Sequence, residues 1–134
     1  MVYQMILDAP VKVLNRIGLN GKLRAVNEVE ANSLRIAGIG GGRVGDAMVV
    51  VGNLLLDFDY SLMSNVWKVP NQHFRNLALE TMEERVGTLN KLGCDHTSES
   101  LESYLAEAFD ESFERPLNEP VSYTHLTLPT ICSV

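Results

Sequence analysis

The sequence has no excess of basic residues. Its 134 residues include 11 Lys and Arg against 17 Asp and Glu, which gives a formal net charge of −6. Because nucleic-acid binding needs a basic patch to neutralise phosphates, this composition argues against a nucleic-acid partner. The sequence also lacks an apolar run of the roughly 20 residues that would span a bilayer, and it lacks the pattern of a signal peptide. We therefore expect a cytoplasmic protein that binds neither nucleic acid nor a membrane.

Cysteine is scarce as well. The two cysteines, Cys94 and Cys132, are expected to be free thiols rather than one disulfide, because no secretory signal is visible. Hydrophobic residues make up 46% of the chain and charged residues 21%, which is ordinary for a globular protein. A chain of this length has room for one small domain with a modest core.

The last fourteen residues differ in character from the rest of the chain. From Val121 they read VSYTHLTLPTICSV, with no acidic residue and no basic residue except His125. Through Thr130 this segment resembles the conceptual translation of a transposase sequencing adaptor; the alternative is a natural Thr-rich strand, since the segment alternates as strands do. We expect a natural domain over residues 1–120 and a non-native tail over residues 121–134 that packs peripherally, so Tyr123, His125 and Cys132 are assigned to no site.

Residues 1–59 are expected to form one helix followed by strands. The apolar spacing of Leu7, Val11 and Leu14 predicts a helix that ends near Gly18, and Pro10 fits best in its first turn, which favours a start there. Three strands are predicted next, over residues 23–29, 34–39 and 46–57, with turns at 30–33 and 40–43. The last strand is apolar on both faces, which is typical of a central strand that is covered on both sides.

The second half of the natural segment is expected to be helical. Short helices are predicted over residues 60–67 and 71–79, and residues 81–92 are helical or irregular. The strongest pattern predicts an amphipathic helix over residues 98–115 with Thr97 as its N-cap. Strands followed by helices indicate an α+β fold whose strands form an antiparallel meander.

Two glycine features stand out in the strands. Gly40, Gly42 and Gly45 match a GxGxxG pattern, but a dinucleotide site needs a helix after it, whereas a strand is predicted here. The pattern therefore favours a tight hairpin, or a hairpin whose bare backbone lets a ligand lie against the sheet. Gly52 interrupts the most apolar strand, which indicates either a packing accommodation or a groove for an acyl chain or planar ring.

Other residues that could carry chemistry have plain structural interpretations too. Arg35 lies in the middle of a predicted strand, where a basic residue often just faces solvent. Cys94 is followed closely by His96, although nucleophile and base are rarely close neighbours in sequence. His73 and His96 lack metal-ligand spacing and are interpreted as surface residues.

Several of these residues, in this order, resemble a known family. Residues 27–89 look like the second half of the catalytic domain of the lipoate–protein ligase A family, of the biotin/lipoate ligase fold. The matching motifs are Asn27-Glu28, Arg35-Ile36-Ala37-Gly38, Val51-Gly52-Asn53-Leu54-Leu55-Leu56 and Arg85-Val86-Gly87-Thr88-Leu89. The resemblance implies an α+β domain with a partial antiparallel sheet and packed helices.

The resemblance also implies a reaction and its site. The family activates lipoate with ATP and Mg²⁺ as lipoyl-adenylate and transfers the acyl group to a lysine of a lipoyl-domain acceptor protein. It would make Arg35 the catalytic cation between the two anionic reactants, and Glu28 the residue that helps to hold the metal. Asn27, Glu28, Gly38 and Gly52 would then contribute to the binding of nucleotide and acyl substrate.

This sequence departs from the family pattern in three ways. Arg35 stands where the family has lysine, which keeps the charge but replaces a compact donor with a planar fork. Glu28 stands where the family has aspartate. No counterpart of the family's upstream Arg-Arg and Gly-rich segment precedes Met1, so we expect a truncated fragment that is itself inactive. Two alternatives stay open: an octanoyl or lipoyl transferase of the same fold, for which only Cys94 is available, and a non-catalytic binding homologue.

Overall fold

Helix α1 (Val2–Arg16) begins the part of the chain that the computed structural model describes, residues 2–113. The side chains of Leu7, Val13 and Leu14 are fully buried, and the helix ends before Gly18, whose φ is +84°. The expected start at Pro10 was wrong, because Pro10 lies inside the helix. A proline there cannot donate to the carbonyl four residues earlier, but its side chain is buried and the helix continues through it.

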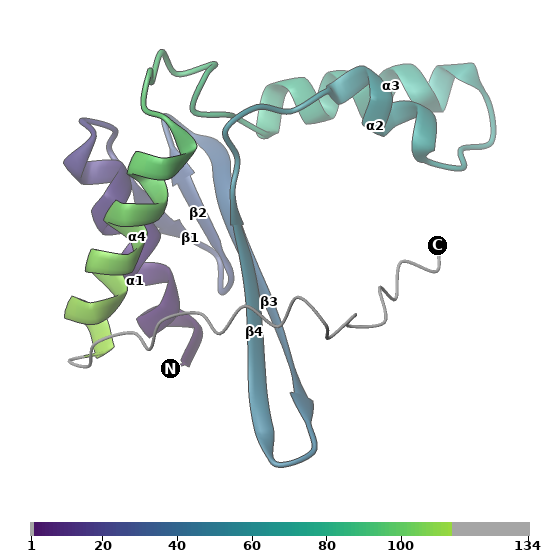
Figure 1. The fold of residues 1–134 in the computed structure, drawn as a ribbon. Helices are drawn as coiled ribbons and strands as arrows, with labels where there is room; N and C mark the ends of the chain where they lie inside the picture. Colours follow the sequence, from purple (N-terminus) through teal and green to yellow (C-terminus); the bar gives the residue numbers. More distant parts are fainter. Residues whose placement is uncertain (1, 114–134) are drawn as a thin grey trace.

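The four strands form one antiparallel sheet in the order β1-β2-β3-β4 (Figure 1). They are β1 (Lys22–Arg24), β2 (Glu28–Ala31), β3 (Leu34–Val44) and β4 (Ala47–Leu54). The α+β class and the antiparallel meander are thus confirmed.

Two strand boundaries differ from the expectation. The segment expected as one strand over residues 23–29 is two strands, because Ala25 has a φ of 53° and turns the chain. The expected turn at residues 40–43 lies inside β3, and the hairpin turns instead at Gly45, whose φ is +59°. A glycine can take that left-handed conformation without strain, whereas Gly40 and Gly42 are extended and pair with Val51 and Val49.

Strand β4 was expected to be central and covered on both faces, and this was wrong. It is the last strand of the sheet within the described residues, and Met48, Val49 and Val51 are 64%, 44% and 69% exposed. Figure 1 shows the β3–β4 hairpin projecting beyond α1 and α4. A fully apolar strand indicates cover on both faces only when the rest of the chain supplies it, and residues 2–113 do not.

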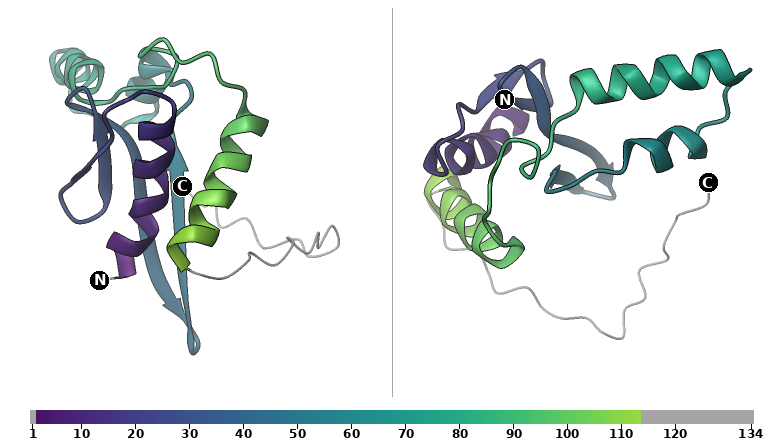
Figure 2. Two further views of the ribbon diagram at one scale, coloured as in Figure 1. Left: turned by 90° about the vertical axis from the view of Figure 1, so that its left-hand side faces the viewer. Right: turned by 90° about the horizontal axis from the view of Figure 1, so that it is seen from above.

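Helices α2 (Tyr60–Val66) and α3 (Gln72–Arg85) form an arm that extends away from the sheet (Figures 1 and 2). Asp59 caps α2 by accepting from the Leu62 amide at 2.8 Å, and Asn71 caps α3 by accepting from the Phe74 amide at 3.1 Å. The arm is anchored at its base, where the Tyr60 hydroxyl donates to the Val86 carbonyl at 2.7 Å. Its exposed apolar side chains are Leu62, Val66, Trp67, Phe74 and Leu77.

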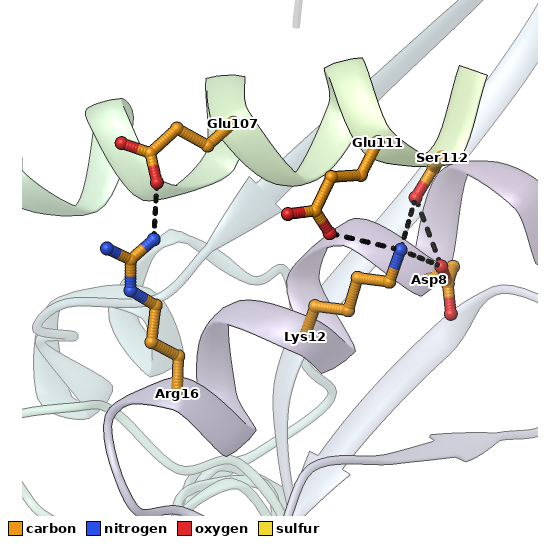
Figure 3. Close-up of polar contacts among 6 residues, drawn as sticks. All are labelled: Asp8, Lys12, Arg16, Glu107, Glu111 and Ser112. Carbon is orange, nitrogen blue, oxygen red and sulfur yellow. Dashed lines mark hydrogen bonds and ion pairs between the residues drawn. The ribbon is translucent and has the colours of Figure 1, made fainter. Parts of the chain in front are cut away.

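Helix α4 (Ser98–Phe113) packs beside α1 on one face of the sheet (Figure 2). Thr97 caps it as expected, accepting from the Ser100 amide at 3.2 Å. The two helices bury Leu101 and Ala108 against a core built from α1 and the inner strands. Across their outer surface, polar contacts join them (Figure 3), and these involve Asp8, Lys12, Arg16, Glu107, Glu111 and Ser112.

The described residues leave some expectations untested. Residues 121–134 lie outside them, so the expectation that this tail packs peripherally stays a prediction. Within residues 2–113, no helix is long and apolar enough to cross a membrane.

Candidate active site

A β-bulge decides the direction of the Arg35 side chain. Val29 pairs with Ala37, but the next residue, Glu30, pairs with Arg35, so Ile36 is an extra residue in β3. Regular alternation would place Arg35 on the same face as Ala37, beneath the helices. The bulge turns Arg35 to the opposite face, where Glu30 lies across from it.

On this face the structure brings together three of the residues that the sequence singled out. The Nε atom of Arg35 lies 3.2 Å from Oε1 of Glu28. Gly38 makes room for the guanidinium, because a Cβ atom at Gly38 would lie 2.5 Å from Nη2 of Arg35. Arg35, Glu28 and Gly38 therefore form one polar cluster over strands β2 and β3.

The cluster lines a cavity of about 260 Å³ between the sheet and the end of helix α3. The position of the helix end is set by the backbone, because the Gly87 amide donates to the Arg35 carbonyl at 2.9 Å. Besides Arg35 and Glu28, the cavity is lined by Arg24, Thr81, Met82, Arg85 and Val86.

The guanidinium of Arg35 is not fully satisfied. Its Nε atom is buried and has no hydrogen-bond partner, although the Glu28 carboxylate is close. The contact with Glu28 is therefore electrostatic, and the N–H does not point at a carboxylate oxygen. A buried donor without an acceptor costs about 1–3 kcal/mol, and more when the group is charged. As a whole, the Arg35 side chain is 40% exposed and lines the cavity, so its terminal N–H groups could donate to an anion such as a phosphate group.

The same residues do not make a metal site on their own. Glu28 is the one carboxylate that lines the cavity within the described residues, and it already faces Arg35. Residues 2–113 contain no group of three His, Cys, Asp or Glu side chains that could hold a metal ion. Mg²⁺ commonly binds one or two carboxylates together with substrate phosphates. A metal contact at Glu28 therefore stays a prediction that depends on a bound nucleotide.

Asn27 has a structural role in this chain. Its side-chain amide donates to the Ile39 carbonyl at 3.1 Å, and its backbone carbonyl accepts from the Ile39 amide at 2.9 Å. These bonds attach the β1–β2 turn to strand β3. Asn27 does not line the cavity of Arg35.

Gly52 lies on the other face of the sheet. It pairs with Ile39 and lines a second, apolar cavity of about 270 Å³ beneath α1 and α4, together with Ile6, Pro10 and Phe109. The resemblance would place Arg35 and Gly52 in one site, and the spacing of the two strands predicts that they flank one concave surface. This prediction was wrong, because the bulge at Ile36 turns Arg35 to the opposite face of the sheet. A Cβ atom at Gly52 would lie 2.7 Å from Cγ2 of Ile39, which favours the packing explanation for this glycine.

Two arginines that line the cavity were not identified as site residues from the sequence, and no histidine was assigned to the site. Arg24 and Arg85 share the cavity with Arg35; Arg85 belongs to a motif that carries the resemblance, but nothing in the spacing shows that it approaches Arg35. Cys94 is half-buried, packs against the hydrophobic core and does not line the cavity of Arg35. His96 contacts the ring of Tyr104, with ring centroids 5.8 Å apart.

Comparison with known families identifies the chain. The family model described as the lipoyl protein ligase A/B catalytic domain matches residues 2–110. The chain belongs to this family. The chain also shares its fold with solved structures, and no curated protein sequence matches it significantly.

Two of these structures are lipoate–protein ligases, and a third is a complex with lipoate. A bipartite lipoate protein ligase from Thermoplasma acidophilum has a TM-score of 0.79 and 23% identity, covering 88% of this chain and 47% of its own. Lipoate-protein ligase A bound with ATP has a TM-score of 0.68 and 21% identity, with coverages of 88% and 47%. LipL1 of P. falciparum in complex with lipoate has a TM-score of 0.60 and 17% identity, with coverages of 83% and 31%. The chain thus spans about half the length of the first two.

Proposed function

We propose that this chain is part of an ATP-dependent lipoate–protein ligase. The proposed activity is the activation of lipoate as lipoyl-adenylate, with release of pyrophosphate, followed by acyl transfer to a lysine of a lipoyl domain. The observation that carries the proposal is the partly exposed guanidinium of Arg35, which lies beside Glu28 and lines the cavity, at the position of the family's strand cation. Solved structures of the same fold with ATP or lipoate bound support it.

The chemistry explains why a cation is needed at Arg35. In the first step a lipoate carboxylate oxygen attacks the α-phosphorus of ATP, and the bond to pyrophosphate breaks. Two anions must approach each other, so a positive group between them lowers the barrier. In the second step the lysine amine attacks the acyl carbon, AMP leaves, and a proton is lost from the nitrogen. Arg35 would stabilise the phosphate charge in both steps.

The other residues have supporting roles in the proposal. Glu28 holds Arg35 in place through the 3.2 Å ion pair and would share Mg²⁺ with the nucleotide phosphates. Gly38 leaves room for the guanidinium, and Asn27 fixes the turn before β2. Gly52 would contribute only indirectly to substrate binding, since it lies across the sheet from Arg35.

The transferase alternative is less well supported. Such an enzyme would carry the acyl group as a cysteine thioester, and Cys94 is the one cysteine within the described residues. It lies outside the cavity of Arg35 and packs against the core. Incubation with an octanoyl-carrier thioester, followed by mass spectrometry, tests this alternative; we expect no acylated Cys94.

Binding of a hydrolysis-resistant lipoyl-adenylate analogue tests the ligase proposal. We expect the chain to bind this analogue in isothermal titration calorimetry and to bind it more tightly than AMP or lipoate alone, because it presents both groups in one molecule. A non-catalytic lipoate-binding homologue would bind lipoate and the analogue equally well. That result, or stable acylation of Cys94, would overturn the proposal.

We further propose that the chain by itself is catalytically inactive. Activation of lipoate requires both substrates to be held in near-attack geometry, yet within residues 2–113 the sheet leaves β4 uncovered. In an ATP–pyrophosphate exchange assay with Mg²⁺ and lipoate, we expect no exchange above background. Exchange at the rate of an intact ligase would contradict this proposal.

A further inference from the structure

We infer that Gly87 is a positioning residue for Arg35. Because Gly87 has no side chain, the segment that follows helix α3 can lie directly against strand β3 and hold the bulge that gives Arg35 its direction. The inference rests on the proposed function in that Arg35 is the cation of the proposed reaction. Gly87 does not line the cavity of Arg35, so it would act on the site only through the backbone of β3.

The backbone of Gly87 is joined to the bulge itself. Its amide donates to the Arg35 carbonyl at 2.9 Å, and the preceding residue, Val86, forms a parallel bridge with Arg35. A bulge disrupts the ladder of hydrogen bonds between its strand and the neighbouring strand, so the bulged residues need other partners. The Ile36 carbonyl accepts from the Leu55 amide at 2.8 Å, and the Arg35 carbonyl accepts from Gly87.

The space beside the bulge at this position admits only a glycine. A Cβ atom at Gly87 would lie 2.6 Å from Cδ1 of Ile36 and 2.7 Å from Cβ of Leu34, the two residues that flank Arg35 in β3. Cδ1 of Ile36 is the end of a side chain and can rotate away, but Cβ of Leu34 is fixed to the backbone. The φ of Gly87 is not positive, so the close approach, not the backbone conformation, requires a glycine here.

The segment that contains Gly87 is also held from its other side. The Leu89 amide donates to the Leu55 carbonyl at 2.9 Å, and the Tyr60 hydroxyl donates to the Val86 carbonyl at 2.7 Å. Leu89 is 1% exposed and belongs to the core. The segment therefore cannot move away from β3 as a unit without breaking these contacts, so a side chain at Gly87 would displace the bulge.

A displaced bulge would change the surroundings of the Arg35 guanidinium. The bulge places Arg35 on the face of the sheet where its Nε atom lies 3.2 Å from Oε1 of Glu28. On the same face, the guanidinium occupies the room that Gly38 leaves. A shift of the Arg35 backbone would alter both contacts, whereas a change of packing elsewhere in the core would alter neither.

The test compares Gly87→Ala with the matched control Gly21→Ala. A Cβ atom at Gly21 would lie 2.8 Å from Cβ of Leu14, so each variant brings a new Cβ atom against the Cβ atom of a leucine. Both glycines are buried, and neither lines the cavity of Arg35. Two quantities are measured at a temperature at which circular dichroism shows both variants folded. They are the NMR resonance of the Arg35 Nε–H, assigned by its loss in Arg35→Gln, and the affinity for the lipoyl-adenylate analogue.

We expect Gly87→Ala to move the Arg35 resonance and to weaken binding of the analogue severalfold. Gly21→Ala should lower the unfolding temperature as well, but it should change neither the resonance nor the affinity. An unmoved resonance with wild-type affinity in Gly87→Ala, or equal changes in Gly21→Ala, would overturn the inference. The proposed function fails separately: if the resonance moves but the wild-type chain does not bind the analogue, the positioning role stands and the ligase assignment does not.

Ile36→Val is a milder second variant that tests the same contact if Gly87→Ala does not fold. It removes Cδ1, the atom that a Cβ atom at Gly87 would meet first. We expect the Gly87 amide to exchange faster with solvent and the Arg35 resonance to move with it, because both depend on the same contact. The control Ile39→Val shortens a partly buried side chain of the same strand and should change neither. Faster exchange with an unmoved Arg35 resonance, or no change in either, would overturn the inference.

Discussion

Gly38 matters for the site because it has no side chain and so leaves room for the guanidinium of Arg35. A Cβ atom there would lie 2.5 Å from Nη2 of Arg35, and Nη2 is the end of a flexible side chain that can move away. We therefore expect Gly38→Ala to displace the guanidinium, weakening the binding of the lipoyl-adenylate analogue severalfold with little change in unfolding temperature.

Gly40→Ala is the matched control for Gly38→Ala. Gly40 lies two residues further along the same strand, and a Cβ atom there would meet nothing within 4 Å. Both variants replace an extended glycine in β3, so they share the same backbone effect. If the two variants bind the analogue with the same affinity, Gly38 has no part in positioning Arg35.

At the scale of elements, α1 and α4 are held together by their buried apolar faces rather than by the ion pairs of Figure 3. Leu101 is 3% exposed, so Leu101→Ala is expected to lower the free energy of unfolding by about 2–5 kcal/mol. Leu77→Ala, at a position that is 45% exposed, should change it by less than about 0.5 kcal/mol. Urea unfolding followed by circular dichroism measures both, and equal effects would contradict the assigned core.

The ion pairs between these helices are solvent-exposed and should contribute little. A hydrogen bond with Asp8 raises the pKa of Lys12. A raised pKa means that this contact stabilises the fold below the ordinary lysine pKa and is lost as the pH rises through the raised value. Arg16→Gln, which removes the pair with Glu107, is expected to leave the urea midpoint almost unchanged.

Local sequence patterns predicted several helix boundaries. They did not predict which face of the sheet a side chain occupies or which elements pack together. Thr97 begins α4 and a glycine ends α1, as capping rules indicate. The bulge at Ile36 could not be anticipated, because no glycine or proline marks it, and it reversed the face of Arg35 relative to Gly52. The motif order indicated Arg35 and Glu28, but only tertiary packing brings Arg85 from the end of α3 to the same cavity.

At the scale of the whole molecule, the outer edge of β4 should make the isolated chain associate. This edge is unpaired within the described residues, and β4 carries no charged residue (Ala47–Leu54), which favours pairing between edges. We expect the chain to form dimers or larger species at raised concentration in sedimentation velocity. Val51→Lys, at a site 69% exposed, should reduce this association, whereas the control Val26→Lys, at a site 73% exposed in the β1–β2 turn, should not. A strictly monomeric wild-type chain would contradict this expectation.

The central claim is that the cation of Arg35 binds an acyl-adenylate. The most direct measurement is the affinity of the hydrolysis-resistant lipoyl-adenylate analogue for wild type, Arg35→Gln, Arg35→Lys and the exposed control Arg43→Gln. We expect Arg35→Gln to bind at least about tenfold more weakly, since a charge-assisted contact is lost. Arg35→Lys, which restores the family's residue, should retain most of the affinity, and Arg43→Gln should match wild type. Equal affinity of wild type and Arg35→Gln would contradict the claim.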